Sequence, residues 1–529
     1  MTDPVRDEVQ SDDRTLTRDS AHDVAVVAKG GAVQIAGQVT QRSLSFFFTA
    51  VLQQILGTAA LGLYRLVAQV LIIGGQLGLL GFNYASMRWI ARARVAKDHG
   101  LVRGAAQVGL TASAVSSLII AGALVLLAPQ IAPLFCKNNC DVARFTELLR
   151  VGALYVPFFA LTQVLRYCTQ GYKTMVPSVV VGNIIQPAVR FVIGVALLLA
   201  GFEVLGAVIT LVLSFMVAAA AGSTYLRRML RVEEHPGPTV RPFRDMVRFA
   251  LPQAGSSLLG IQSLGIGIIL LGGLLETKFQ AGLFAIALAL QGPAGVFLSG
   301  IVNIWAPVVS DLYERGDLNR LEALYQTITR WIATFAFPIS TAMILEPDLF
   351  LIFFGRDAAP AAPVIAVLAV GNLFYSGSGP TGYVLSMTGR PGVNFVNSIV
   401  GVALYTGLGF IFVPKYGALG MAWVDAGVTA AINTARVIQA KVLVGVQPFG
   451  RSFIKPVVAT IVAACVLLLW RLIPGDGYGI EAAGVAVAGV VYVAVLGAFG
   501  IDEQERYVWE RIKRRAMRNR RGGDQSKHP

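Results

Sequence analysis

Long apolar runs follow one another along almost the whole chain, and short polar segments separate them. A helix of about 20 apolar residues crosses the hydrocarbon of a bilayer, so windows of that length mark candidate spans. They predict fourteen, at residues 30–54, 59–83, 104–128, 150–169, 175–200, 204–226, 249–274, 281–305, 328–345, 362–386, 393–413, 417–440, 454–472 and 482–500. The pattern predicts an all-α integral membrane protein with about 14 transmembrane helices.

The composition agrees with a membrane protein. Of the 529 residues, 55% are apolar and only 14% are charged, and the mean hydropathy is +0.65. Such a chain has too little polar surface to stay dispersed in water. No stretch has the pattern of a nucleotide-binding loop, a nucleophile triad or a zinc-binding helix, so we expect no enzyme activity, no cofactor and no metal.

Three pairs of glycine-containing segments recur in the same order. Residues 60–70, 169–183 and 203–214 match residues 280–290, 387–401 and 417–428, with offsets of 220, 218 and 214. Internal repeats are common in transporters, where the substrate site lies between them. The repeat predicts two pseudo-symmetric six-helix bundles, an N-lobe and a C-lobe, followed by a helical hairpin.

Polar segments mark the borders between the predicted parts. The first residues are polar and mixed in charge and lack the apolar core of a signal peptide. We expect a disordered cytosolic N-tail at 1–29, the N-lobe at 30–226, a basic cytosolic linker at 227–248, the C-lobe at 249–441, the hairpin at 453–500 and a basic cytosolic C-tail at 501–529.

Basic residues gather on one side of the predicted membrane. Most of the 44 Lys and Arg residues fall in the loops on the side of both termini, including the tail "ERIKRRAMRNRR". The positive-inside rule then places both termini in the cytoplasm. The net charge of +14 is expected to attract anionic membrane lipids. Because this charge is spread over short loops at the membrane surface, we expect no nucleic-acid partner.

Polar side chains recur at helical spacing within three spans of the N-lobe. The first span carries Gln34, Gln38, Arg42, Ser45, Thr49 and Gln53 at steps of 4, 4, 3, 4 and 4; the second carries Arg65, Gln69, Gln76 and Asn83; the fifth carries Asn183, Gln186 and Arg190. Such stripes are too costly to face lipid, so each is expected to face water or a partner helix.

Four arginines are predicted to lie at different depths of the N-lobe, Arg166 near the cytoplasmic end, Arg42 and Arg190 near the middle and Arg65 near the outer end. Ionised groups within a membrane often mark substrate paths, although those near the headgroups also snorkel or bond to carbonyl oxygens. The predicted substrate-binding residues are Arg42, Arg190, Arg65, Arg166, Gln38, Asn183 and Gln186.

A few other polar residues have two interpretations each. Asp425, the one acid of span twelve, would either couple transport to an ion or tie two helices together. Cys136 and Cys140 are predicted to lie in an outer loop, where they would either form a disulfide or stay as thiols.

Several stretches resemble a known family. "ALGLYRLVAQVLIIGGQLGLLGFNYASMRWIA" (60–91), "FALPQAGSSLLG" (249–260), "MTGRPGVNFVNS" (387–398) and "FVPKYGALGMAWV" (412–424) resemble the polysaccharide transporters. These are the Wzx-type flippases of lipid-linked oligosaccharides, in the multidrug/oligosaccharidyl-lipid/polysaccharide exporter superfamily. The family often has an acid in span seven, where this chain has Gly267.

The resemblance implies that a polyprenyl-diphosphate-linked oligosaccharide moves from the cytoplasmic to the outer leaflet of the cell membrane by alternating access. Other polysaccharide-assembly proteins would then be candidate partners. Arginine suits phosphate oxygens, and the amides of Gln and Asn suit sugar hydroxyls. Two alternatives are a multidrug or toxin exporter of the same superfamily and a membrane glycosyltransferase or polymerase, which would need catalytic carboxylates.

Overall fold

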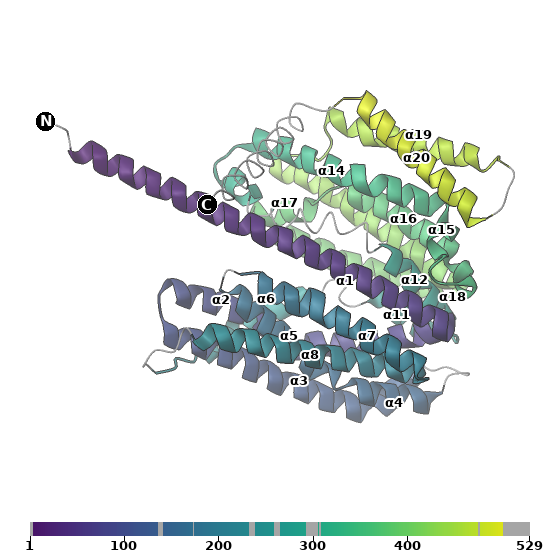
Figure 1. Ribbon diagram of the computed structural model, residues 1–529, viewed down its shortest axis with the longest axis horizontal. Helices are drawn as coiled ribbons and strands as arrows, with labels where there is room; N and C mark the ends of the chain where they lie inside the picture. The colour runs from purple at the N-terminus through teal and green to yellow at the C-terminus, as the bar shows by residue number, and fades with distance from the viewer. Residues whose placement is uncertain are drawn as a thin grey trace, which may run out of the picture. The chain divides into compact units, whose positions relative to one another are not determined.

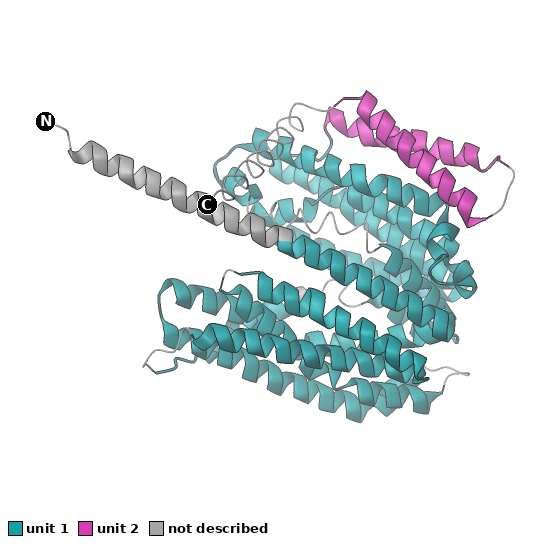
Figure 2. Ribbon diagram, in the orientation of Figure 1, with its two compact units in different colours: residues 1–449 teal, residues 450–529 magenta. Residues whose placement is uncertain are grey.

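The computed structural model describes residues 4–135, 141–172, 174–231, 238–258, 265–291, 305, 308–473 and 477–500, with side chains from Val33 on except those of 256–258. Two compact units divide the chain, Met1–Phe449 and Gly450–Pro529 (Figure 2). The described residues are helical or lie in turns and connections, as the fold-class prediction requires.

The first unit contains two groups of helices with α1 between them (Figure 1). The N-lobe consists of α1 (Pro4–Leu79), α2 (Phe82–Val95), α3 (His99–Phe135), α4 (Val142–Gly152), α5 (Tyr155–Gln170), α6 (Val176–Val179), the π-helix η1 (Val180–Ile185), α7 (Gln186–Leu199) and α8 (Glu203–Arg231).

The C-lobe follows in the second half of this unit. Its elements are α9 (Phe243–Leu258), α11 (Ile266–Leu274), α12 (Phe279–Gln291), α14 (Leu318–Leu345), α15 (Pro347–Leu351), the 3₁₀-helix η2 (Arg356–Ala361), α16 (Ala362–Gly377), α17 (Thr381–Met387), α18 (Pro391–Gln439) and the π-helix η3 (Ala440–Val444).

The second unit is a helical hairpin, as predicted for 453–500. It consists of η4 (Arg451–Phe453), α19 (Ile454–Trp470) and α20 (Tyr478–Ala498). The Trp470 indole Nε1 donates to the Ile480 carbonyl at 2.9 Å, and Gly484 leaves room for the same indole ring. A hydrogen bond and a small residue therefore join the two helices where they meet.

The described helices agree with the predicted number of spans. Ten are long and apolar enough to cross a membrane. Two of these, in α1 and α18, bend at Gly57 (φ 80°) and Gly417 (φ 57°), and each therefore holds two of the predicted spans. Positive φ angles suit glycine, which has no Cβ to clash. Ten helices thus account for twelve spans, and the other two fall in 249–274 and 281–305, which the structure describes in part.

One border differs in detail from the sequence prediction, and a second lies where the side chains are not described. The helix α9 was expected to belong largely to the C-lobe, but Met246 and Ala250 are buried in one core with residues of α2, α3 and α5. The residues that follow α9, 259–264, lie outside the described residues. The helix α1 begins at Pro4, but its side chains are described only from Val33, so the disordered tail predicted for 1–29 stays a prediction.

The hydrophobic core is shared by the two lobes at one end of the first unit and divided at the other. A single buried cluster joins both lobes around Leu61 and Phe284, at the end where α1 and α18 bend, here called the kink end. At the opposite end, here called the basic end, the N-lobe cluster around Phe82 and the C-lobe cluster around Tyr325 are separate. The lobes are thus packed together at the kink end and apart at the basic end.

Paired glycines make the close contact at the kink end. A Cβ on Gly62 would overlap the carbonyl oxygen of Lys278, and a Cβ on Gly282 would overlap that of Thr58. The two contacts are equivalent under the predicted offset of 220, because Thr58 matches Lys278 and Gly62 matches Gly282. Reciprocal contacts between equivalent residues are what a twofold axis produces. The contact therefore supports the repeat.

Two hydrogen bonds reinforce this contact. The Gln54 side chain donates to the Phe353 carbonyl at 2.8 Å, and the Thr58 hydroxyl donates to the Asp357 carbonyl at 3.1 Å. Phe46 also makes edge contacts with Phe353 and Phe354. All three connect α1 to the α15–η2 region of the C-lobe, so the kink end is closed by backbone packing, hydrogen bonds and aromatic contacts together.

We expect Gly282→Val to push the lobes apart at the kink end, because the carbonyl that its side chain would meet belongs to a helix backbone and cannot rotate away. Spin labels at positions 54 and 353 should then report a longer distance than in the otherwise unsubstituted protein. Gly407→Val, at a position with open space around it, is the control and should leave the distance unchanged. An unchanged distance in Gly282→Val would contradict the assignment of this contact.

Candidate functional site

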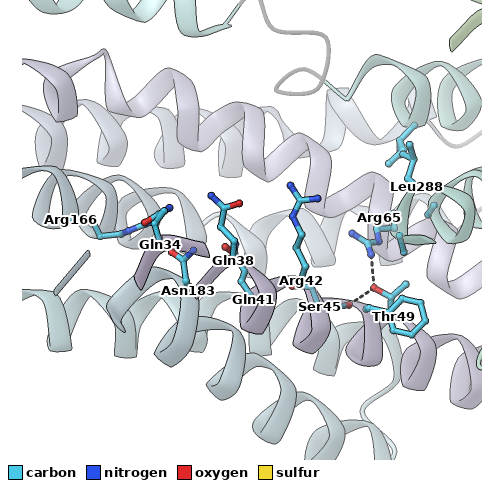
Figure 3. Close-up of a pocket in the computed structure, with 14 residues that line it drawn as sticks. Gln34, Gln38, Gln41, Arg42, Ser45, Thr49, Arg65, Arg166, Asn183 and Leu288 are labelled. Carbon is cyan, nitrogen blue, oxygen red and sulfur yellow. Dashed lines mark hydrogen bonds between the residues drawn. The ribbon is translucent and has the colours of Figure 1, made fainter. Parts of the chain in front are cut away.

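A cavity of about 510 Å³ lies between the lobes, with α1 along one wall (Figure 3). Its volume is in the range of small-molecule binding sites, about 300–1,000 Å³. The lining residues are Gln34, Gln38, Gln41, Arg42, Ser45, Phe46, Thr49, Arg65, Arg166, Asn183, Ile268, Ala285, Leu288 and Ala289. The polar ones come from the N-lobe, whereas α11 and α12 of the C-lobe contribute an apolar wall.

The polar stripe predicted for the first span lines this cavity. Five of its six members do so, and Figure 3 shows them in a row along α1. The sixth, Gln53, instead donates a 2.7 Å hydrogen bond to Thr58 across the bend at Gly57. Gln53 therefore stabilises the kink rather than the cavity surface. Within this stripe, the helical spacing therefore predicted the lining residues of α1 correctly except for Gln53, which lies near the bend.

Arg65 is held at the end of the cavity nearest the kink. Its Nη2 donates to the Thr49 hydroxyl at 2.6 Å, and Thr49 in turn donates to the Ser45 carbonyl at 2.8 Å. The Nε of Arg65 is buried and has no hydrogen-bond partner within the described part of the chain. The guanidinium is thus oriented by one side chain and keeps donor capacity for a ligand.

Arg166 is held at the end nearest the basic end. Its guanidinium donates to the Ser178 carbonyl and the Asn183 side chain, both at 3.1 Å. Gly182 makes this possible, because a Cβ there would overlap the guanidinium. Gly182 and Asn183 lie in the π-helix η1, an irregularity often found at functional sites. Arg166 and Asn183 were predicted separately, and the fold joins them.

The other two predicted residues of the fifth span do not line the cavity. Gln186 is buried and donates to the Ser214 hydroxyl of α8 at 3.0 Å. The prediction that Asn183, Gln186 and Arg190 share one face assumed a regular α-helix, but residues 180–185 form the π-helix η1, whose wider turn does not keep that spacing. Gln186 and Arg190 are therefore not among the lining residues of this cavity, and a role for them in substrate binding stays a prediction.

Arg190 instead packs against α1 within the N-lobe. Its guanidinium donates to the Tyr64 hydroxyl, and it lies over the rings of Phe48, at 4.9 Å from the centroid, and Tyr64, at 5.8 Å. Cation–π contacts stabilise a cation where water is scarce. Arg190 also lies within electrostatic range of Arg65. It therefore adds positive potential near Arg65 and is not among the lining residues of the cavity.

Asp425 is tied to a tyrosine within the C-lobe. Its carboxylate accepts a hydrogen bond from Tyr405, on the other limb of α18. The Tyr405 hydroxyl would lie 2.9 Å from a Cβ on Gly267. This geometry fits the interpretation of Asp425 as a tie between helices, and its role in ion coupling stays a prediction. Cys136 and Cys140 lie outside the described residues, so the disulfide stays a prediction too.

Periodicity did not identify every lining residue. Gln41 lies beside Arg42 in the sequence and outside the predicted stripe, but the cavity is wide enough to expose both. Ile268, Ala285 and Leu288 carried no signal, because an apolar residue that faces a cavity looks the same in the sequence as one that faces lipid. Only the packing of α11 and α12 against α1 reveals them.

The cavity is cationic. Arg42, Arg65 and Arg166 line it, and none of the described lining residues is acidic. In a medium of low dielectric constant, such charges attract anions strongly. A set of fixed arginines with amides and hydroxyls between them can bind phosphate oxygens in bidentate fashion and can bond to neutral polar groups nearby.

A two-lobed helical bundle in a membrane, with a polar cavity between its lobes, is an arrangement typical of membrane transporters. The chain belongs to the polysaccharide biosynthesis protein family, which matches residues 27–313, more than half of its length. The family identification made from the sequence is thereby confirmed, and so is the expectation of a transporter rather than an enzyme.

Named relatives resemble the chain in sequence, and solved structures resemble it in fold. The chain is 24% identical to stage V sporulation protein B of Bacillus subtilis, over 74% of this chain and 79% of that protein. It is 26% identical to capsular polysaccharide biosynthesis protein CapF of Staphylococcus aureus, over 37% and 50%. The structure of the lipid II flippase MurJ in an inward closed conformation matches with a TM-score of 0.72 at 13% identity, over 88% of this chain and 98% of that one. A multidrug resistance MATE family transporter of the MOP superfamily, in an inward-facing conformation, matches with a TM-score of 0.62 at 18% identity, over 78% and 98%.

We expect Gly182→Ala to move the Arg166 guanidinium away from Asn183, because the added methyl group would take its place. The end of a long side chain can shift at little cost to the fold. Labelling of Arg166 by a dicarbonyl reagent, measured by mass spectrometry, should become several-fold faster. Gly122→Ala, where nothing lies nearby, is the control. Equal labelling in both variants would show that Gly182 does not position Arg166.

Proposed function

We propose that this protein is a flippase that moves a polyprenyl-diphosphate-linked oligosaccharide from the cytoplasmic to the outer leaflet of the cell membrane, for the synthesis of a cell-surface polysaccharide. The observation that carries the proposal is the placement of Arg42, Arg65 and Arg166 along one interlobe cavity that has no acid among its described lining residues. The names of the relatives, a capsular polysaccharide protein and a lipid II flippase, support the same class of substrate.

The cavity offers each part of such a substrate a suitable environment. A diphosphate carries negative charge on oxygens that arginine binds in pairs. Gln34, Gln38, Gln41 and Asn183 supply amides, which both donate and accept hydrogen bonds and so suit sugar hydroxyls. A cavity of about 510 Å³ suits the diphosphate and the first sugars. The lipid chain would stay in the bilayer.

The arrangement of the cores supports alternating access. The lobes share a core at the kink end and have separate cores at the basic end, so the described state would admit substrate from the basic end. The basic loops favour a cytoplasmic location for that end. Release to the other leaflet requires the glycine contact at the kink end to separate and the basic end to close. Rocking of two bundles about a fixed site accomplishes this in transporters with such repeats.

The two alternatives fit the cavity less well. An exporter of cationic drugs would need acidic groups, and three arginines would repel its substrate. A glycosyltransferase or polymerase would need carboxylates as acid or base at the site, and the described lining has none. Better binding of a lipophilic cation than of a lipid diphosphate, or elongation of a glycan by the purified protein, would favour one of these instead.

We expect Arg42→Ala to slow flipping of a fluorescent lipid-linked glycan in proteoliposomes by about tenfold or more, because a charge-assisted hydrogen bond contributes about 1.5–3 kcal/mol. Arg42→Lys should keep part of the activity, since it keeps the charge but not the planar fork. Arg315→Gln removes an exposed C-lobe arginine, paired with Asp311, and is the matched control. Normal transport by Arg42→Ala would refute the cationic path.

Arg190 should contribute less to substrate binding than Arg42, because Arg42 lines the cavity and Arg190 does not. We expect Arg190→Ala to weaken binding of a polyprenyl diphosphate by less than about fivefold, as befits a charge without direct contact. Thermal stability should fall, because Phe48 and Tyr64 lose a packed partner. A loss of binding equal to that of Arg42→Ala, at unchanged stability, would show that Arg190 touches the substrate.

A further inference from the structure

A second polar cluster lies in the C-lobe, outside the lining of the cavity described above. It consists of Tyr375 on α16, Tyr383 on α17, and Asn394 and Arg436 on α18, and we call it the C-lobe cluster. Tyr375 is within electrostatic range of both Arg436 and, on the N-lobe, Arg42. Tyr383 likewise lies near enough to interact electrostatically with Tyr84, on α2 of the N-lobe. Each of the two tyrosines therefore has an N-lobe side chain in its surroundings.

Arg436 is a cation without an acidic partner. Its Nε is buried and makes no hydrogen bond to the described residues, and no described acid forms an ion pair with it. The nearest atom of its guanidinium would lie 3.9 Å from a Cβ on Gly382, in the same helix as Tyr383. An unpaired charge in a membrane protein is costly and is usually kept for a function.

The side-chain amide of Asn394, in the C-lobe cluster, does not make all of its hydrogen bonds. Its Nδ2 donates weakly to Ser386 at 3.3 Å, and its Oδ1 is buried without a partner among the described residues. One turn further along α18, Asn397 shows the contrast, because it exchanges two hydrogen bonds with Gln439, at 2.6 and 3.1 Å. These helices can therefore satisfy an amide fully, and at Asn394 they leave an acceptor unused.

The two tyrosines leave their rings accessible. Tyr375 is 37% exposed and Tyr383 is 44% exposed, although both lie near polar and charged side chains. A tyrosine offers an apolar face and a hydroxyl at its tip. Sugars need both, since a pyranose ring has apolar C–H faces and polar edges. Aromatic faces, an open amide and a single arginine together match a sugar with a carboxylate, because the guanidinium fork binds a carboxylate in bidentate geometry.

We propose that the C-lobe cluster binds the glycan of the substrate and selects glycans that carry a carboxylate-bearing sugar, which Arg436 recognises. The inference rests on the proposed function and deepens it. The N-lobe arginines hold the diphosphate, and the C-lobe cluster reads the sugars across the interlobe space. The division explains why most of the cationic groups lie on one lobe while the exposed tyrosines lie on the other.

The test measures binding of three lipids to the purified full-length protein: a polyprenyl diphosphate with an acidic oligosaccharide, one with a neutral oligosaccharide of the same length, and one without sugar. We expect Arg436→Gln to weaken binding of the acidic lipid by about tenfold or more and that of the other two by less than about twofold. Arg436→Lys should fall between Arg436→Gln and the unsubstituted protein. Arg315→Gln is again the control.

A second variant covers the case in which Arg436→Gln does not fold. Tyr375→Ala should weaken binding of both glycan lipids by several-fold and leave binding of the sugar-free lipid unchanged, because it removes a stacking face but no charge. Tyr375→Phe should retain most of the affinity. Equal loss for all three lipids in Arg436→Gln would assign the cluster to the diphosphate and overturn the inference, while the proposed function would stand. Failure of the unsubstituted protein to bind any of the three would overturn both.

Discussion

Charged and amide side chains cannot face hydrocarbon, and this constraint organises the structure. Arg42 and the glutamines before it lie on one stripe of α1, which must be covered by protein or water wherever it crosses the membrane. The fold meets the requirement by placing α1 between two bundles, so that the stripe faces the interlobe cavity (Figure 1). The position of the cavity and the polar wall that α1 contributes follow from the sequestering of this stripe, while Arg65 and Arg166 add to the cationic character from outside it.

Small residues decide which end of the cavity is closed. Gly62 and Gly282 let α1 and α12 approach until backbone atoms touch, and the touching residues are equivalents in the internal repeat. The same end also carries the shared hydrophobic core, so separating the lobes there would expose apolar side chains as well as break the glycine contact. The absence of a side chain also matters at Gly182, where it leaves room for the Arg166 guanidinium beside Asn183. Glycine thus serves both the packing of the lobes and the geometry of the site.

Much of the fold and about half of the candidate site could be predicted from the sequence. Apolar length located the spans, and repeated glycines located the two lobes, because both signals depend only on local composition. Arg42, Gln38 and Asn183 were found by helical spacing or depth and do line the cavity. Gln186 and Arg190 do not line the cavity, although Asn183 does; Asn183 lies within a π-helix, whose spacing differs from that of an α-helix, and no residue type marks such an irregularity reliably. Tyr375, Tyr383 and Arg436 were not among the predicted site residues, because the tyrosines are ordinary members of an apolar span and Arg436 lies near the end of its span, where an arginine can snorkel.

The sequence alone determined that the chain is a helical membrane protein with a repeat and a polar stripe, since hydrophobic length and periodicity are properties of single segments. It also determined that the predicted spans of the N-lobe contain arginines and no acidic residue. Only the tertiary structure decided which side chains each of these arginines contacts. Arg166 bonds to Asn183 and Arg65 bonds to Thr49, while Arg190 packs against Phe48 and Tyr64. The physical reason is that each meeting depends on the rotation and bend of two helices, and these are set by packing across the core rather than by the spacing within either helix.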